Sequence, residues 1–383
     1  METLGYFDFS SGVHSRSVAQ RVPVNGTIEV TRRCPLMCLH CYNNLPVGDR
    51  EARSNELTYE EHCRIVDEIS EAGCLWILYT GGEIFVRKDF LDIYTYAKQK
   101  GLLITLFTNG TFLTEKVADY LAEWRPFSIE ITLYGCTKET YEQVTGIPGS
   151  YQRCLHGIHL LLERNLPLKL KTMVLRENKH EIWEMKRFAE EGLGVDFRFD
   201  ALINSRIDCS QKPIEVRLSP PEVVELDLLD VKRVAEFRKF CERFNGPTPR
   251  GQMDDLYHCG AGISSFAIDP YGMLRLCTLS SGNAFDLRKG PFREGWENYL
   301  QEVRQKKISR QTKCVRCELR GTCGMCPPNA ELEKGDAEEP VDFLCHVAHL
   351  RARALGIHVP PHGECKYCQT DQPSAIRCQP SER

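Results

Sequence analysis

The sequence predicts an α/β fold built on a parallel sheet. Six short and mostly apolar runs alternate with helical patterns over about the first 200 residues, and each run ends in a polar or glycine-rich turn. This alternation is typical of parallel sheets, whose strands are buried on both faces and joined by helices. Three cysteines spaced C-x3-C-x2-C follow the first run directly. The start of the sheet therefore also carries metal-binding side chains.

The first predicted strand, residues 27–31, leads into Cys34, Cys38 and Cys41. Thiolates bind zinc, copper(I) or iron–sulfur clusters. A structural zinc site needs four ligands, and the only nearby fourth candidate is His40, which would have to share one ion with its neighbour Cys41. A [4Fe–4S] cluster takes one thiolate per iron, so three cysteines leave one iron open to a ligand. The spacing favours the cluster, with a three-cysteine zinc loop as the alternative.

The remaining elements of this half follow in order. Thr58 and Glu61 have the spacing of a helix-capping pair at the start of a helix over residues 57–73. Further helices are expected at 88–100, 114–124, 137–145, 151–164 and 180–191, and further strands at 75–80, 102–108, 127–133, 168–174 and 195–202. In parallel α/β folds the carboxyl ends of the strands carry the active site. The cysteine loop and the turn Gly81-Gly82-Glu83 both lie at such ends.

The cysteine spacing and the Gly-Gly-Glu turn together resemble the radical S-adenosylmethionine (SAM) enzymes, with His40 at the family's aromatic position before the third cysteine. The resemblance implies a [4Fe–4S] cluster on Cys34, Cys38 and Cys41 whose open iron chelates SAM. It also implies reductive cleavage of SAM to methionine and a 5′-deoxyadenosyl radical. The implied fold is an incomplete (β/α)6 barrel over residues 24–210.

The same resemblance implies contacts to SAM from several strand ends. Gly81, Gly82 and Glu83 would meet its amino group, and Asn109 belongs to a Thr-Asn-Gly turn of the family. Thr132 and Thr172, with Lys171 and Asn178 nearby, match positions that contact the ribose and carboxylate. Each of these residues also fits a plainer reading as a strand-ending turn, a solvated strand end or a helix cap. Alternation leaves open whether Arg198 and Asp200 point toward SAM.

Composition changes after a proline-marked linker at residues 211–256, which includes a charged helical stretch at 221–244. A hairpin is expected at 265–277, with a turn at 269–272. Seven cysteines are spread over this region: Cys259, Cys277, Cys314, Cys317, Cys323, Cys326 and Cys345. The dense central block of four could form one zinc site.

The whole arrangement resembles the SPASM domain, a C-terminal extension of radical SAM enzymes, here over residues 257–350. The resemblance implies two auxiliary iron–sulfur clusters. Auxiliary cluster I would be held by Cys259, Cys277 and Cys326, and auxiliary cluster II by Cys314, Cys317, Cys323 and Cys345. Two residues separate Cys323 from Cys326, whereas the usual SPASM spacing has three. The geometry around Cys326 is therefore open. The fourth ligand of cluster I is open as well, because residues 260–265, where some relatives have an additional cysteine, contain none.

The two ends of the chain carry weaker signals. Residues 1–23 are a polar lead-in expected to pack beside the first strand. The tail, residues 351–383, holds His362, Cys365, Cys368 and Cys378. Its C-x2-C pair could join a zinc site, bind a further cluster or be spare thiols.

The composition limits where the protein is expected to act and what it is expected to bind. The net charge of -4 gives no basic field for nucleic acid, and no apolar run approaches the roughly 18 residues of a membrane span. The start of the chain lacks a signal-peptide pattern. Nineteen cysteines without a secretion signal favour metal ligation over disulfides, so we expect a cytoplasmic protein without nucleic-acid or membrane partners.

The resemblance implies an enzyme that oxidatively modifies a ribosomally made peptide or protein, by a crosslink, decarboxylation or side-chain oxidation. Its partners would be that substrate, possibly a separate recognition protein because only about 25 residues precede the barrel, and an electron donor such as flavodoxin or ferredoxin. One alternative is radical SAM modification of a small molecule or haem-type precursor. Another is a zinc-binding scaffold without catalysis.

Overall fold

The computed structural model describes residues 6–244 and 254–368. The chain forms two compact units. The barrel unit consists of Met1–Asp200 and Gly260–Arg304, and the cysteine-rich unit consists of Ala201–Cys259 and Gln305–Arg383. Each unit is thus built from two separate segments of the chain.

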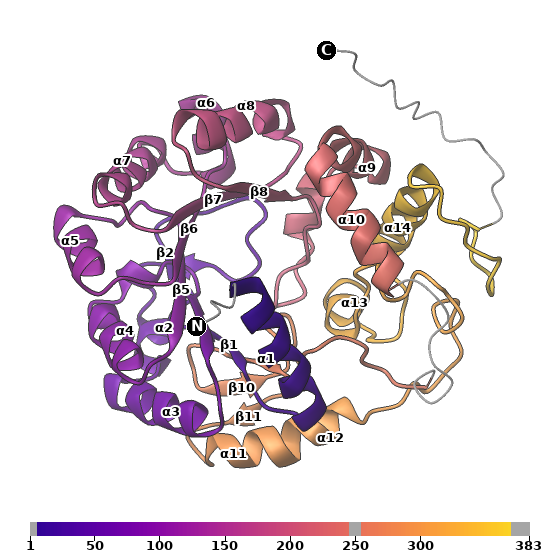
Figure 1. Cartoon of the computed structure of the whole chain (residues 1–383), viewed down its shortest axis with the longest axis horizontal. Coiled ribbons are helices and arrows are strands. Elements are labelled where there is room, and N and C mark those ends of the chain that lie inside the picture. Colours follow the sequence, from indigo (N-terminus) through magenta and orange to yellow (C-terminus); the bar gives the residue numbers. More distant parts are fainter. Residues whose placement is uncertain (1–5, 245–253, 369–383) are drawn as a thin grey trace, which may run out of the picture. The chain divides into compact units, whose positions relative to one another are not determined.

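A nine-stranded sheet forms the centre of the barrel unit, in the order β11-β10-β9-β1-β4-β5-β6-β7-β8. The pairs from β1 to β8 are all parallel, which confirms the predicted α/β class. All six predicted strands are present: β1 (Asn25–Glu29), β4 (Trp76–Thr80), β5 (Leu103–Thr108), β6 (Ser128–Thr132), β7 (Leu168–Met173) and β8 (Phe197–Asp200). Figure 1 shows them curving into a partial barrel.

Helices form a ring outside these strands (Figure 1). They are α3 (Tyr59–Glu71), α4 (Phe90–Gln99), α5 (Glu115–Glu123), α6 (Lys138–Thr145), α7 (Ser150–Glu163) and α8 (Ile182–Arg187). The short helix α2 (Arg50–Asn55) follows the cysteine loop and lies inside this ring in Figure 1. The expected capping pair of α3 is present, since Thr58 and Glu61 exchange both hydrogen bonds. Strand residues alternate between the helix-covered outer face and the inner face of the barrel. Phe199, for example, packs edge-on against Trp183 of α8, so its neighbours Arg198 and Asp200 belong to the inner face.

The first segment forms a helix, α1 (Tyr6–Gln20), that the sequence did not predict. Its His14 ring stacks on Trp76 at the start of β4, with ring centroids 5.2 Å apart. His14 Nδ1 also lies 3.4 Å from Asn25 Nδ2 at the start of β1. The expected packing beside the first strand is present, but through a helix rather than an irregular lead-in.

The predicted hairpin is confirmed and extends the sheet. Strand β9 (Ser265–Ile268) pairs with β10 (Met273–Arg275) in antiparallel fashion and with β1 in parallel, and β11 (Phe285–Asp286) follows at the edge. Helices α11 (Phe292–Glu294) and α12 (Leu300–Arg304) complete this segment. Residues 260–304 therefore pack with the barrel strands, whereas the sequence suggested one continuous C-terminal domain from residue 257.

The cysteine-rich unit contains helices α9 (Pro220–Leu229), α10 (Val231–Phe244), α13 (Pro327–Lys334) and α14 (Asp342–Ala354). The helical stretch expected at 221–244 is two helices, because Asp230 has an extended backbone and its carboxylate accepts from Arg233 N as an N-cap of α10. A buried ion pair joins Arg217 to Glu333, with 2.6 Å between the nearest nitrogen and oxygen. Arg351 of α14 binds Asp227 of α9 at 2.7 Å.

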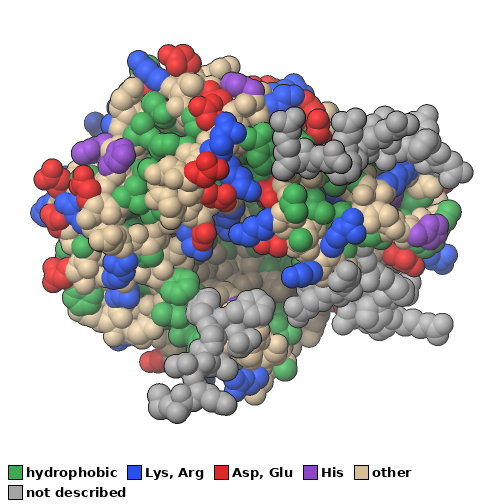
Figure 2. Space-filling view, turned by 45° about the horizontal axis from the view of Figure 1, so that its top comes forward, with side chains coloured by type: hydrophobic (Ala, Val, Ile, Leu, Met, Phe, Trp, Pro, Cys, Tyr) green, Lys and Arg blue, Asp and Glu red, His purple; other side chains and the backbone are tan. Residues whose placement is uncertain are grey.

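The mixture of side chains on the surface agrees with the nearly balanced charge of the sequence. On the face shown in Figure 2, basic and acidic side chains are interspersed with apolar ones. None of the described helices is long and apolar enough to cross a membrane.

Candidate active site

The three-cysteine loop is closed at its base by Glu29, the last residue of β1. The carboxylate of Glu29 accepts hydrogen bonds of 2.7 Å from both Tyr42 Oη and Asn43 Nδ2. Tyr42 and Asn43 directly follow Cys41, so this buried carboxylate fixes the C-terminal end of the loop. Burial raises the pKa of Glu29, and Arg32 at 3.7 Å opposes this rise.

A second carboxylate supports the entry to the loop. Arg33, directly before Cys34, forms a two-pronged ion pair with Glu56, with both nitrogen–oxygen distances at 2.9 Å. Thr31 also donates to Glu56, at 2.5 Å. These side chains are almost fully buried, and removing one partner of such a pair leaves a buried charge uncompensated. The backbone that leads to Cys34 is therefore rigidly held.

The thiols themselves suit an iron–sulfur cluster. Cys34 Sγ receives hydrogen bonds of 3.5 Å from Asn109 Nδ2 and from the backbone N–H of Leu36. Burial raises the pKa of Cys34 to about 12, and the pKa of Cys38 rises through burial and through repulsion from Cys41 and Cys34. Thiols this close together and this buried favour a bound cation, and hydrogen bonds to sulfur are typical of protein-bound clusters.

The His40 side chain has an aromatic neighbour. Its ring packs against Tyr134, with centroids 5.1 Å apart, and Nε2 lies 3.4 Å from the Tyr134 hydroxyl. Burial lowers the pKa of His40 to about 4, which keeps the ring neutral. This placement supports the aromatic role of His40 over the fourth-ligand role.

Gly81 and Gly82 lie directly against the strand that enters the cysteine loop. A Cβ atom on Gly81 would lie 2.1 Å from Thr31 O, and one on Gly82 would lie 2.5 Å from Arg32 O. The backbone of Gly81 also has φ +143°, a conformation that favours glycine. The two glycines are needed so that the ends of β1 and β4 can approach this closely.

Glu83 is fully buried and binds the next strand end. Its carboxylate accepts from Thr108 Oγ1 at 2.7 Å and from Asn109 N at 2.8 Å. Burial raises the pKa of Glu83 to about 7. Because its side chain is used internally, any contact of this turn with SAM would come from the backbone, and the main effect of Glu83 is to place Asn109 beside Cys34.

The other predicted SAM contacts are placed differently. Thr132, at the end of β6, lies on the inner face. Thr172 is buried on the outer face, and its hydroxyl donates to Met173 O. Asn178 is fully buried, and its amide bonds to Leu175 N, Tyr134 O and Met173 O. The geometry is compatible with a ligand role for Thr132 and gives Thr172 and Asn178 structural roles.

A charged cluster on the inner face was only partly visible in the sequence. Glu130 of β6 lies 3.3 Å from Lys171 Nζ of β7 and also binds Arg198 of β8. The Lys171 ammonium sits over the ring of Phe107 on β5. Burial lowers the pKa of Lys171 to about 7, while Glu130 opposes the shift. Glu130 was missed, because only strand register shows that it faces these cations.

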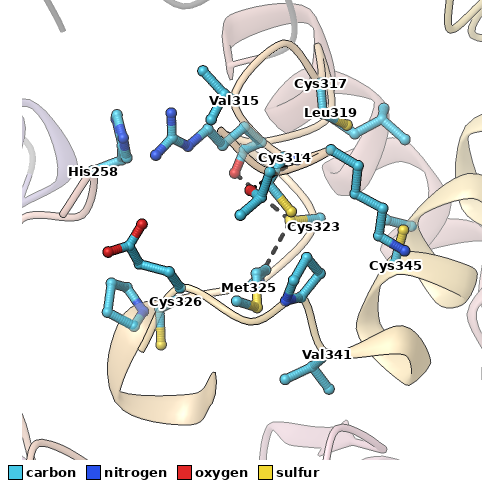
Figure 3. A pocket seen from close by; sticks show the side chains of 18 of the residues that line it. His258, Cys314, Val315, Cys317, Leu319, Cys323, Met325, Cys326, Val341 and Cys345 are labelled. Carbon is cyan, nitrogen blue, oxygen red and sulfur yellow. Dashed lines mark hydrogen bonds between the residues drawn. The ribbon is translucent and has the colours of Figure 1, made fainter. Parts of the chain in front are cut away.

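Six of the seven predicted auxiliary-cluster cysteines line one cavity of about 250 Å³ in the cysteine-rich unit: Cys259, Cys314, Cys317, Cys323, Cys326 and Cys345. Burial is the main reason that the pKa of Cys317 is raised. Electrostatic repulsion from Cys323, Cys314 and Cys345 raises it further. These are the four cysteines expected to share auxiliary cluster II. Figure 3 shows Cys314, Cys317, Cys323, Cys326 and Cys345 around this cavity. Cys277 belongs to the barrel unit.

Comparisons with known proteins settle the family. The pattern of the radical SAM superfamily matches residues 28–189. A PqqA peptide cyclase of Rhizobium meliloti is 30% identical over 357 residues, which cover 86% of this chain and 89% of that protein. The chain belongs to the radical SAM superfamily. As a radical SAM enzyme it binds SAM and a [4Fe–4S] cluster, and the resemblance seen in the sequence is confirmed.

Two further similarities bear on substrate and fold. An AdoMet-dependent heme synthase of Methanosarcina barkeri is 26% identical over 335 residues, which cover 82% of this chain and 94% of that protein. Streptococcus suis SuiB bound to the precursor peptide SuiA has a similar fold, with a TM-score of 0.66 at 16% identity over 90% of this chain and 82% of SuiB. Radical SAM relatives of this chain thus include both peptide and haem enzymes.

Proposed function

We propose that this radical SAM enzyme modifies a ribosomally made peptide or protein and uses two auxiliary iron–sulfur clusters to do so. The observation that carries the proposal is the cavity lined by six predicted cluster cysteines within one compact unit. The relative that is named a PqqA peptide cyclase, and the fold shared with peptide-bound SuiB, support a peptide substrate.

The residues of the chain would divide the work as follows. Cys34, Cys38 and Cys41 would hold the cluster that binds SAM, and reductive cleavage of SAM there supplies the radical that removes hydrogen from substrate. Asn109 donates to Cys34 Sγ and so helps to position it. Glu29 and Glu56 hold the two ends of the loop, which keeps the thiols in place.

The inner face of the barrel provides polar groups for ligands. The side chain of Arg198 is 61% exposed although it binds Glu130, so its guanidinium can also bind a carboxylate of SAM or of substrate. Thr132 lies on the same face, one strand away from Lys171. We assign these residues to binding and orientation. A flavodoxin or ferredoxin remains the expected electron donor.

The assignment of clusters is tested with two groups of variants under anaerobic conditions. Replacing Cys34, Cys38 and Cys41 together with alanine should abolish 5′-deoxyadenosine formation from SAM and dithionite while iron in the cysteine-rich unit remains. Replacing Cys314 and Cys317 should lower iron by about one cluster and leave SAM cleavage in place. Loss of all iron in the first variant would show that the sites are misassigned.

Modification of a haem-type precursor is the second candidate, because the heme synthase of Methanosarcina barkeri covers most of this chain. Incubation of the reconstituted enzyme with an iron porphyrin that carries propionates distinguishes the two. A SAM-dependent loss of mass from the porphyrin would favour this candidate. An unchanged porphyrin, together with deoxyadenosine formation that a peptide substrate stimulates, would support the peptide assignment.

A further inference from the structure

We propose that the cysteine-rich unit contains a zinc site formed by His349, His362, Cys365 and Cys368, separate from the iron–sulfur clusters. The ligand atoms of these four side chains all lie within 4.8 Å of one another. The inference does not depend on the proposed function, because the site would bind a metal whatever the substrate of the enzyme is.

The distances fit one tetrahedral ion. His349 Nε2 lies 3.2 Å from Cys368 Sγ and 3.6 Å from Cys365 Sγ. His362 Nδ1 lies 3.0 Å from Pro360 O, so Nε2 is the nitrogen left for the ion, and it lies 3.8 Å from Cys368 Sγ. With zinc–sulfur bonds of about 2.3 Å and zinc–nitrogen bonds of about 2.0 Å, neighbouring sulfur and nitrogen ligands of a tetrahedron are about 3.5 Å apart. The four side chains are thus already arranged for one ion.

His349 is held in the form that a metal ligand requires. Its Nδ1 lies 2.7 Å from the backbone carbonyl of Cys345, one turn earlier on α14. A proton on Nδ1 that donates to this carbonyl leaves the lone pair on Nε2, which faces the two cysteines. Histidines that bind zinc usually donate their other ring N–H to a carbonyl or carboxylate in this way.

Burial argues that the group has a binding role. His349, His362 and Cys365 are 4%, 7% and 1% exposed. Burying polar rings beside thiols costs free energy unless their polar atoms are satisfied, and zinc would satisfy all four at once.

An iron–sulfur cluster fits the same ligands less well. Two histidines and two cysteines hold a Rieske [2Fe–2S] centre, but there the histidines bind one iron and the cysteines bind the other. Here Cys368 Sγ touches both imidazoles, which suits a single ion. Cys345, a predicted ligand of auxiliary cluster II, has its Sγ 4.0 Å from Cys365 Sγ and lines the cluster cavity. His349 and His362 line the same cavity, so the zinc site would lie next to auxiliary cluster II, and helix α14 would carry one ligand for each.

The site would fasten the segment 359–368 to α14. Two other contacts already join this segment to α14. Tyr367 Oη donates to Asp342 at 2.6 Å, and the Tyr367 ring stacks on His346 with centroids 4.5 Å apart. The ligand pattern His362-x2-Cys365-x2-Cys368 places three ligands in this segment, and His349 supplies the fourth from the helix. Cys378 lies outside the described residues.

The test measures zinc and iron per chain in the full-length protein, purified anaerobically from zinc-containing medium. We expect about one zinc in the wild type, and X-ray absorption at the zinc edge should show two sulfur and two nitrogen ligands. The double variant Cys365→Ser/Cys368→Ser should lose the zinc and keep its iron. Cys209→Ser and His358→Gln, which alter exposed residues, are the matched controls and should keep both metals.

Two further variants keep the test decisive if the double variant is insoluble. Cys368→His should retain zinc with one sulfur fewer, whereas Cys345→Ser should lower iron and retain zinc. The proposal is overturned by a wild type that carries iron without zinc, or by zinc that persists in the soluble double variant. Loss of iron from the double variant would likewise overturn it and assign these cysteines to a cluster.

Discussion

At the scale of single residues, Lys171 is the group whose surroundings most change its chemistry. Its ammonium lies between Glu130 and the ring of Phe107, and burial lowers its pKa from 10.5 to about 7. Between these two pH values the unfolded chain binds a proton at Lys171 that the folded chain does not. Stability therefore rises with pH across this window, as far as Lys171 contributes.

Replacing Lys171 with methionine should remove this contribution, because methionine has a similar length and no proton to lose. We expect the wild type to gain more stability than the variant between about pH 7 and about pH 9. Urea unfolding of both proteins at the two pH values measures how much the free energy of unfolding of each protein changes with pH. The many thiols titrate in both proteins, so their effect cancels when the two changes are compared. Equal gains would show that Lys171 is protonated in the folded protein at both values.

Residue roles were predictable where the chemistry is local in sequence. The spacing of Cys34, Cys38 and Cys41 is readable because three thiolates in eight residues have few other uses. The partners of this loop were not readable. Glu29 and Glu56 look like ordinary charged residues, and only the fold brings them to Asn43 and Arg33. Thr172 was assigned to SAM by position, but the alternation of β7 places it on the outer face.

At the scale of elements, the turn after β4 does the most to shape the site. Thr31 O accepts a hydrogen bond of 2.7 Å from Gly82 N, and the carbonyls of residues 31–33 leave no room for a side chain on either glycine. This turn therefore couples the end of β4 to the backbone that enters the cysteine loop.

Replacing Gly81 with alanine should destabilise the protein and reduce iron binding by the cysteine loop, because the new methyl group would collide with Thr31 O. Gly101→Ala is the control. Gly101 also has a positive φ, of 83°, but no atom lies within 4 Å of an added Cβ. The control should cost only the backbone strain, about 1–2 kcal/mol. Urea unfolding and iron content measure both effects, and equal losses in the two variants would contradict the clash.

The strands of the barrel were predictable as elements, since parallel strands are apolar runs with clear ends. Other features were not. Helix α1 lacks a strong apolar stripe and depends on contacts such as His14 with Trp76. The break between α9 and α10 was missed because Asp230 is a single polar residue in a helical pattern, and its capping bond to Arg233 N depends on local geometry.

At the scale of the whole molecule, the two units differ in how much apolar core they have. Two of the buried apolar clusters in the described part of the cysteine-rich unit are small. One contains Cys317, Leu319, Ala348 and Ala352, and another contains Ala330, Val341 and Leu344. Bound metal supplies folding free energy where a core is small. The cysteine-rich unit should therefore depend on its metals more than the barrel does.

Removing the metals with a chelator under anaerobic conditions should increase amide hydrogen exchange in α13 and α14. The same treatment should leave β4, β5 and β6 protected, because these strands lie in the middle of the sheet. Hydrogen exchange with mass spectrometry, before and after chelation, gives the comparison. Uniform loss of protection in both units would show that the metals stabilise the whole chain.

The pairing of β1 with β9 has a consequence for synthesis on the ribosome. One edge of β1 meets β4 soon after it is made, but the other waits for Ser265–Ile268. At about 5–20 residues per second, the roughly 230 intervening residues take on the order of 10 to 50 s to translate. During that time the nascent chain exposes an unpaired strand edge beside the three-cysteine loop. Such edges recruit other strands, so this interval is when the protein most needs a chaperone.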